Sequence, residues 1–140
     1  MKTIIYMISL LLLSSFVFAQ EWTADLRVTT SDSSSLDPVV ASDPGATIMH
    51  LAFVDGAAAK NIYYNRLDAF GLPIGADRRI SQTTGEAKQP AIAVDVQRNK
   101  HIVWADADDV HFNFKILYTK LDASGNVVID RRVITDAAIT

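Results

Sequence analysis

The chain has 140 residues, 13 basic and 16 acidic side chains, no cysteine and a formal net charge of −3 at pH 7. Its length fits one domain of ordinary size, and the interspersed charges contain no basic stripe that would suit nucleic acid or an anionic membrane. The lack of cysteine excludes a disulfide framework and a lipid-anchoring thiol.

Residues 1–19 have the pattern of a cleaved secretory signal. Lys2 precedes an apolar run that ends in Val-Phe-Ala before Gln20, and small residues at this place suit a signal peptidase. The alternative is a membrane anchor, which needs roughly 20 apolar residues, whereas the run from Ile4 to Ala19 is shorter and holds three serines. We expect cleavage between Ala19 and Gln20, a secreted or periplasmic protein, and no membrane association after the signal is removed.

The rest of the chain repeats itself. LRVTTSDSSSLDPVVASD, starting at Leu26, matches RRISQTTGEAKQPAIAVD, starting at Arg78, at an offset of 52 residues. The match continues at offsets of 51 to 54 through five further pairs, which are His50 and His101, Phe53 and Trp104, Asp55 and Asp106, Tyr64 and Tyr118, and Gly71 and Gly125. A period of this length indicates a repeat architecture.

Each unit contains four segments of strand composition and none with helical spacing. They are residues 38–42, 47–55, 61–68 and 72–80, followed by 90–95, 100–106, 115–122 and 126–133. The second segments are apolar on both faces, which predicts strands covered on both sides, and the LDAFG and LDASG stretches predict tight hairpin turns.

Four-stranded antiparallel repeats with doubly covered inner strands predict an all-β fold made of β-propeller blades. We place the first blade at about 38–81, the second at about 90–134, and residues 26–30 as an outer strand that closes the ring by completing its last blade. Propellers close with four to eight blades, so the ring encoded here is incomplete. Either the sequence is the front part of a longer protein, or several copies assemble, most plausibly a trimer with six blades.

The motifs P-x-[IV]-A-x-D, [IM]-H-[IL]-x-[WF]-x-D and I-x-Y-x-x-L-D-x-x-G resemble the repeat of bacterial secreted sialidase-like propellers of the BNR-like superfamily. The resemblance extends from Leu26 to Val133. It implies a propeller that acts on or binds glycans. Two features of the family are absent from the sequence: the Asp-box consensus S-x-D-x-G-x-x-W, and an Arg-Ile-Pro signature for the arginine that binds the substrate carboxylate.

Repeated polar residues are interpreted first as structural. His50 and His101 occupy the same place in both units, which favours a hydrogen-bonded structural role over catalysis or metal binding. Asp55 and Asp106 end their strands and are expected to accept backbone hydrogen bonds in the turns that follow. The Arg-Arg pairs at 78–79 and 131–132 lie on outer strands, where adjacent side chains face opposite ways and cannot form one clamp.

The two units differ most in the loop after the second strand, which has nine residues between Asp106 and Ile116 but six between Asp55 and Ile62. Acidic and aromatic groups on such a loop suit a sugar or a calcium ion. The candidate ligand-binding residues are Asp106, Asp108, Asp109, His111 and Phe112. The alternative is that Phe112 and Phe114 extend the third strand and pack against the next blade. No cofactor is expected, and calcium is no more than an open alternative.

These observations predict a non-catalytic binding or scaffold module with a glycan as its partner. The alternative is the N-terminal portion of a sialidase-like glycoside hydrolase. The missing signatures favour the binding module, since the sequence contains no complete catalytic constellation.

Overall fold

The computed structural model describes residues 25–45, 47–107 and 114–135, and within these ranges the chain is all-β. The first four strands are β1 (Leu36–Ser42), β2 (Met49–Asp55), β3 (Asn61–Leu67) and β4 (Arg78–Arg79). The next four are β5 (Glu86–Val94), β6 (Lys100–Ala107), β7 (Phe114–Leu121) and β8 (Val127–Val133). No helix that could serve as a membrane span occurs in the described part of the chain.

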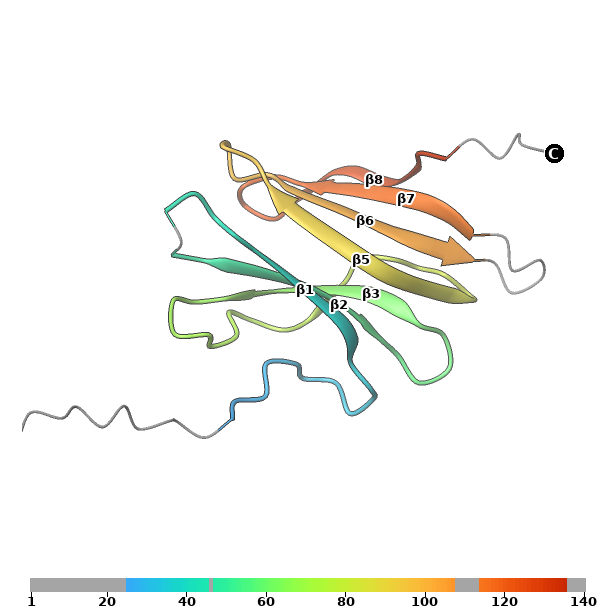
Figure 1. The fold of residues 1–140 in the computed structure, drawn as a ribbon, viewed down its shortest axis with the longest axis horizontal. Helices are drawn as coiled ribbons and strands as arrows, with labels where there is room; N and C mark the ends of the chain where they lie inside the picture. Colours follow the sequence, from blue (N-terminus) through green and yellow to red (C-terminus); the bar gives the residue numbers. More distant parts are fainter. Residues whose placement is uncertain (1–24, 46, 108–113, 136–140) are drawn as a thin grey trace, which may run out of the picture.

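The strands form two four-stranded antiparallel sheets, in the orders β1-β2-β3-β4 and β5-β6-β7-β8. Within each sheet every strand is hydrogen-bonded to the next one in the sequence, so each sheet is a meander built from one repeat unit. Figure 1 shows the two sheets as stacked layers, with β5 lying closest to the first sheet. The repeat in the sequence is therefore a repeat of the same sheet.

The first strand of each sheet begins earlier than expected, at Leu36 and Glu86, upstream of Pro38 and Pro90. A β-bulge in each strand explains the difference, because the register shifts between Leu36 and Val39 and again between Lys88 and Ala91. The residues before the prolines have positive φ values, 49° at Asp37 and 52° at Gln89. Proline cannot donate a ladder hydrogen bond, and a bulge is one of the places where a sheet tolerates it.

A hydrophobic core fills the space between the two sheets. The first sheet contributes Ala52, Val54, Ile62 and Tyr64, and the second contributes Ile102, Trp104 and Leu121. Phe53 and Trp104, which occupy equivalent positions, are each only 1% exposed, as the repeat predicts. The inner strands β2, β3 and β6 are the most buried elements, whereas β4 and β8 are largely exposed, which confirms that the fourth segments are outer strands.

The hairpin turns between the third and fourth strands have the predicted chemistry. The Gly71 amide donates to the Asp68 carbonyl and the Gly125 amide to that of Asp122, both at 3.0 Å. The two glycines have φ values of +80° and +91°, a region of backbone conformation that glycine adopts at no steric cost.

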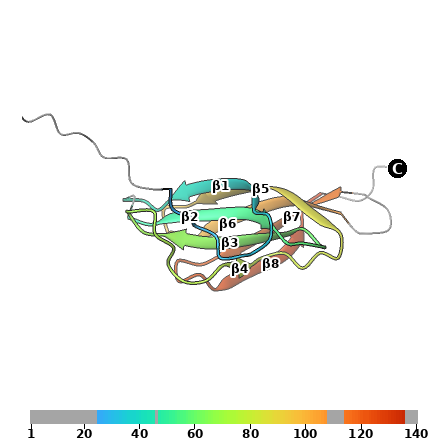
Figure 2. The same ribbon diagram turned by 90° about the horizontal axis from the view of Figure 1, so that it is seen from below.

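The segment 26–30 was expected to be an outer strand, but it forms no strand in this structure. Residues 25–35 instead cross the face of the first sheet that is turned away from the second (Figure 2). The Thr30 amide and hydroxyl both donate to Asp77, at 2.7 and 2.8 Å. Because β8 already fills the outer place of the second sheet, pairing of this segment with the last blade of a closed ring stays a prediction.

Candidate functional site

One end of the two sheets collects the loops that differ most between the repeats. The antiparallel order brings the β2–β3 and β6–β7 connections to this end, together with the segments that lead into β1 and β5. Asp55 and Asp106 end their strands here, at equivalent positions. Loops held by a rigid sheet are common places for binding groups. The hydrogen-bond partners and burial of the two aspartates show which carboxylate is open to a ligand.

Asp55 is enclosed by hydroxyl groups from the segment that enters the first sheet. Its carboxylate accepts hydrogen bonds from Ser31 at 2.9 Å, from Ser35 at 2.8 Å and from Ser33, and the Gly56 amide donates to it at 2.5 Å. Burial raises the pKa of Asp55, but the hydrogen bonds from Ser33, Ser35, Ser31 and Gly56 together lower it by more. The pKa of Asp55 is therefore below its ordinary value. With 1% exposure, Asp55 is a structural anchor, and its bond from Gly56 confirms the expected turn contact.

In the described part of the chain, Asp106 is not enclosed by serine hydroxyls as Asp55 is. At the offset of 52, Ser31, Ser33 and Ser35 correspond to Thr83, Gly85 and Ala87. The Asp106 carboxylate instead accepts a hydrogen bond from the Trp104 indole N–H at 2.9 Å. Phe53, the counterpart of Trp104, has no such donor, so the exchange of phenylalanine for tryptophan accompanies the loss of the serines.

Asp106 is half-buried and lines a cavity of about 280 Å³. The cavity is bounded by Gln82, Thr83, Thr84, Asp106, Lys115, Leu117 and Val133. The Thr83 hydroxyl is oriented by two contacts, since it donates to the Ala107 carbonyl at 3.2 Å and accepts from the Gly85 amide at 3.1 Å. The lining therefore combines one carboxylate, one ammonium, two hydroxyls and an amide with a small apolar surface.

Of the predicted ligand-binding residues, Asp106 is placed at this cavity, whereas Asp108, Asp109, His111 and Phe112 lie outside the described residues. Phe114 begins β7, which confirms that it extends the third strand, and the Lys88 ammonium lies 3.8 Å from the centre of its ring. Within the described ranges no group of three or more His, Asp or Glu side chains could hold a metal ion. The lining residues Thr83, Thr84 and Lys115 were not singled out from the sequence, although Thr83 and Thr84 replace Ser31 and Asp32 of the first unit.

Comparisons with known proteins address the fold. No family model matches the chain, and a search of curated proteins finds no match. Among solved structures, the chain is similar to the endo-arabinase from Bacteroides thetaiotaomicron, with a TM-score of 0.57 at 16% identity, over 83% of this chain and 48% of that one. The chain thus spans about half the length of that enzyme.

The two sheets are β-propeller blades. The first blade is β1–β4 and the second is β5–β8, and they do not form a closed ring. At this level of identity the likeness shows the fold alone. It confirms the propeller part of the predicted resemblance, and it is a likeness to an arabinase rather than to a sialidase.

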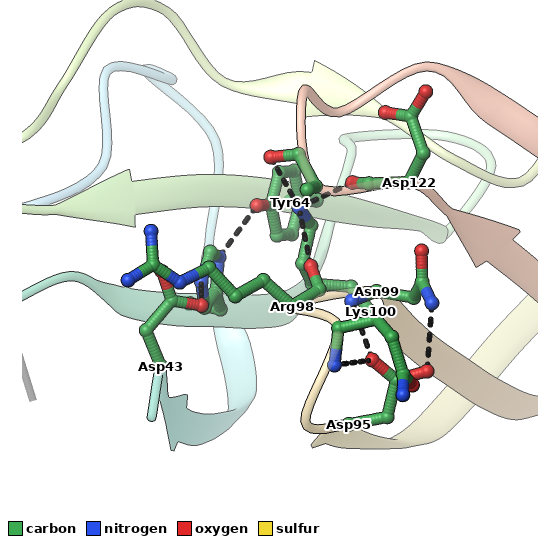
Figure 3. A network of polar contacts seen from close by, with 10 residues as sticks. Asp43, Tyr64, Asp95, Arg98, Asn99, Lys100 and Asp122 are labelled. Atoms are coloured by element: carbon green, nitrogen blue, oxygen red, sulfur yellow. Dashed lines mark hydrogen bonds and ion pairs between the residues drawn. The ribbon is translucent and has the colours of Figure 1, made fainter. Parts of the chain in front are cut away.

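Each blade contains the same hydrogen-bonded set of aspartate, histidine and tyrosine, which is buried in the first blade and half-buried in the second. In the first blade, His50 Nε2 lies 2.8 Å from Asp43 Oδ1 and Nδ1 lies 2.7 Å from the Tyr64 hydroxyl (Figure 3). In the second, His101 makes the corresponding contacts with Asp95 and Tyr118, at 3.2 and 2.8 Å. The histidines are therefore structural, as the repeat predicted.

Burial governs the titration of the set in the first blade. It lowers the pKa of His50, although the hydrogen bond that His50 donates to Asp43 works in the opposite direction. Burial also raises the pKa of Tyr64 to about 12. The lowered pKa of His50 and the raised pKa of Tyr64 both favour the neutral forms at pH 7. This suits a buried structural hydrogen-bond network and not a proton-transfer site.

Lys100 is a buried cation that sequence reasoning missed. Its side chain is 1% exposed, and its ammonium donates to the carbonyls of Arg98, Asp122 and Ala123, at 3.2 and 3.1 Å for the first and last (Figure 3). Burial lowers its pKa, while the charge of Asp43 works against that shift. The available signal was that the equivalent residue of the first blade is Met49, so the charge is specific to the second blade.

Proposed function

We propose that this chain is a secreted, non-catalytic carbohydrate-binding module of the propeller class, which holds a glycan at the cavity beside Asp106. The observation that carries the proposal is the difference between two equivalent aspartates. Asp55 is enclosed by serines, whereas Asp106 lines an open cavity with threonine, glutamine and lysine side chains.

The lining of this cavity suits sugar hydroxyls, which both donate and accept hydrogen bonds. Asp106 accepts, Lys115 donates, and the Thr84 hydroxyl does either. A volume of about 280 Å³ lies at the lower end of the roughly 300 to 1,000 Å³ of drug-sized ligand sites, so it fits one sugar ring or the end of a chain. The similar solved structure is an endo-arabinase, which makes arabinose-containing glycans the first ligands to test.

Hydrolysis is the second candidate function, and the similarity to an enzyme favours it. Most glycoside hydrolases use two carboxyl groups roughly 5 to 10 Å apart on either side of the scissile bond. Among the described residues, the cavity lining contributes one, Asp106. We therefore place binding before catalysis and regard the N-terminal part of a glycoside hydrolase as the alternative.

A glycan array on the purified protein, followed by calorimetry with the best ligand, tests the proposal. We expect Asp106→Asn to weaken binding about tenfold, because a hydrogen bond to a charged group contributes about 1.5 to 3 kcal/mol. Asp55→Asn is the matched control, and it should lower stability more than affinity. Steady release of reducing ends from the bound glycan, abolished by Asp106→Asn, would instead support the hydrolase.

Export is part of the same proposal, since extracellular glycans are reached only outside the cell. The apolar segment 1–19 and its Val-Phe-Ala ending support removal of a signal between Ala19 and Gln20. Mass spectrometry of the exported protein should find a new N-terminus within one or two residues of Gln20. Recovery of exported protein with Met1 intact would contradict it.

A further inference from the structure

A second cleft lies between the two blades, at the end opposite to Asp106. It has a volume of about 230 Å³ and is lined by Tyr64, Asn65, Arg66, Ile74, Gly75, Ala76, Arg78, Ser124 and Gly125. The first blade supplies most of the lining, and the β7–β8 turn of the second blade closes it. The lining contains two guanidinium groups and no carboxylate, which distinguishes it from the cavity at Asp106.

The two arginines reach the cleft because of strand register. Arg78 pairs with Tyr64 across β3 and β4, and Arg66 follows two residues later on β3, so both project from the same face of the blade. Arg79 pairs with Tyr63 and therefore lies on the other face, where its Nε donates to the Ser81 carbonyl at 2.8 Å.

Donor capacity remains on both guanidinium groups. Arg78 donates to the Gly125 carbonyl of the second blade through Nη1, and a guanidinium has five N–H donors. Among the described residues, neither Arg66 nor Arg78 forms an ion pair with a carboxylate. The two guanidinium groups therefore place positive charge in the cleft, and the neighbouring Asp77 carboxylate accepts hydrogen bonds from Asn65 and Thr30 instead.

We propose that this inter-blade cleft binds the carboxylate of an acidic sugar residue. Guanidinium forks match planar carboxylates in geometry and charge. The remaining lining suits the sugar ring, since Ile74, Ala76 and the Tyr64 ring offer apolar surface and Ser124 offers a hydroxyl. At about 30 Å³ per water molecule, a cleft of about 230 Å³ holds more than a bare anion. This site goes beyond the proposed function and does not depend on Asp106.

Titration of the ¹⁵N-labelled protein with glucuronate tests the assignment, with glucose as the uncharged analogue and sodium sulfate as the anion alone. We expect glucuronate to shift the amide signals of Gly75, Ala76, Ser124 and Gly125, and glucose to leave them in place. Arg66→Gln and Arg78→Gln should each weaken glucuronate binding about tenfold or more, and Arg79→Gln should leave it within about twofold.

Arg66→Gln is the decisive variant, because Arg78 also bridges the blades and its loss could loosen the fold. A thermal melt of each variant separates that effect from lost affinity. Glucuronate binding that survives both cleft substitutions, or that never occurs, overturns the assignment. Equal shifts with sulfate reduce the cleft to a general anion site and overturn the sugar part. Asp106→Asn should not change the glucuronate-induced shifts at Gly75, Ala76, Ser124 and Gly125, so failure here and failure of the proposed function give different results.

Discussion

At the scale of single residues, equivalent positions of the two blades have different roles. Asp55 and Asp106 end the same strand, yet one is held by three serine hydroxyls and the other accepts one indole N–H beside a cavity. For this pair of aspartates, the same residue at the same place of the repeat has two different roles. The neighbours that changed between the repeats, and not the conserved aspartate, indicate the candidate binding site.

Trp104 should be the most sensitive position of the inter-blade core. It is 1% exposed, and truncating a buried aromatic residue typically costs about 3 to 5 kcal/mol, so Trp104→Ala should lower the free energy of unfolding by that amount. Trp104→Phe copies the first blade, keeps a ring in place and should cost about 1.5 to 3 kcal/mol, the range for a hydrogen bond to a charged group. Urea denaturation measures both, and a loss below about 1 kcal/mol for Trp104→Ala would show that the side chain is not in the core.

His50 should make the fold sensitive to mild acid. Its folded pKa is lowered from 6.5, so the unfolded chain takes up a proton as the pH falls below about 6.5, while the folded chain resists protonation. The free energy of unfolding should therefore fall from pH 7 to pH 5. His50→Gln should be less stable at pH 7 by about 1 to 3 kcal/mol, because it leaves buried partners unpaired. Its stability should change less between pH 7 and pH 5, and an equal slope in both proteins would exclude His50 as the cause.

At the scale of elements, hydrogen bonds from Lys100 connect two hairpin turns of the second blade. Its ammonium binds a carbonyl of the β5–β6 turn and two carbonyls of the β7–β8 turn. The first blade has Met49 at this place, so its corresponding turns are held without an ammonium group.

Lys100→Met should therefore loosen the β7–β8 turn more than the rest of the blade. We expect a loss of about 1.5 to 3 kcal/mol, the range for hydrogen bonds to a charged group, and faster hydrogen exchange at the Asp122 and Gly125 amides. Lys120→Met, on the neighbouring strand, is the control and should change stability by about 0.5 kcal/mol or less. Unchanged exchange at the turn would show that its own hydrogen bonds are sufficient.

At the scale of the whole molecule, the two blades cover each other on opposite faces, so that equivalent faces of the two blades have different neighbours. The Ala52 and Val54 face of the first blade is covered by the Trp104 face of the second. The equivalent face of the second blade carries Val103, which is half-buried, and alternation along β6 turns Val103 away from the first blade. In a closed propeller this face of β6 would pack against a further blade, as the Ala52 and Val54 face packs against the second blade here.

We predict that residues 20–140 by themselves aggregate or associate, with a trimer of six blades as the expected assembly. Val103→Lys should shift the protein toward monomer without unfolding it, because the substituted side chain lies outside the inter-blade core. Sedimentation of the purified protein over a range of concentrations measures this. A parent protein that stays monomeric on dilution and melts cooperatively would refute the open-face argument.

The sequence by itself determined the features that depend on local pattern. The period of 51 to 54 residues, the alternation along the strands and the Asp-to-Gly turns predicted two four-stranded blades, buried aromatics at 53 and 104, and structural histidines. Each of these follows from residues close together in the chain, or from the same residue types recurring at a fixed offset.

Only the tertiary structure decided which distant side chains meet. The serines at 31, 33 and 35 meet Asp55 because the entering segment crosses the first blade, and that path replaced the strand expected at 26–30. Lys100 donates to the carbonyls of a turn more than 20 residues away in the sequence. The cleft that contains Arg66 and Arg78 exists because the β7–β8 turn of the second blade lies against the first blade. Composition and spacing do not encode these contacts directly, since they depend on how two completed sheets twist and stack.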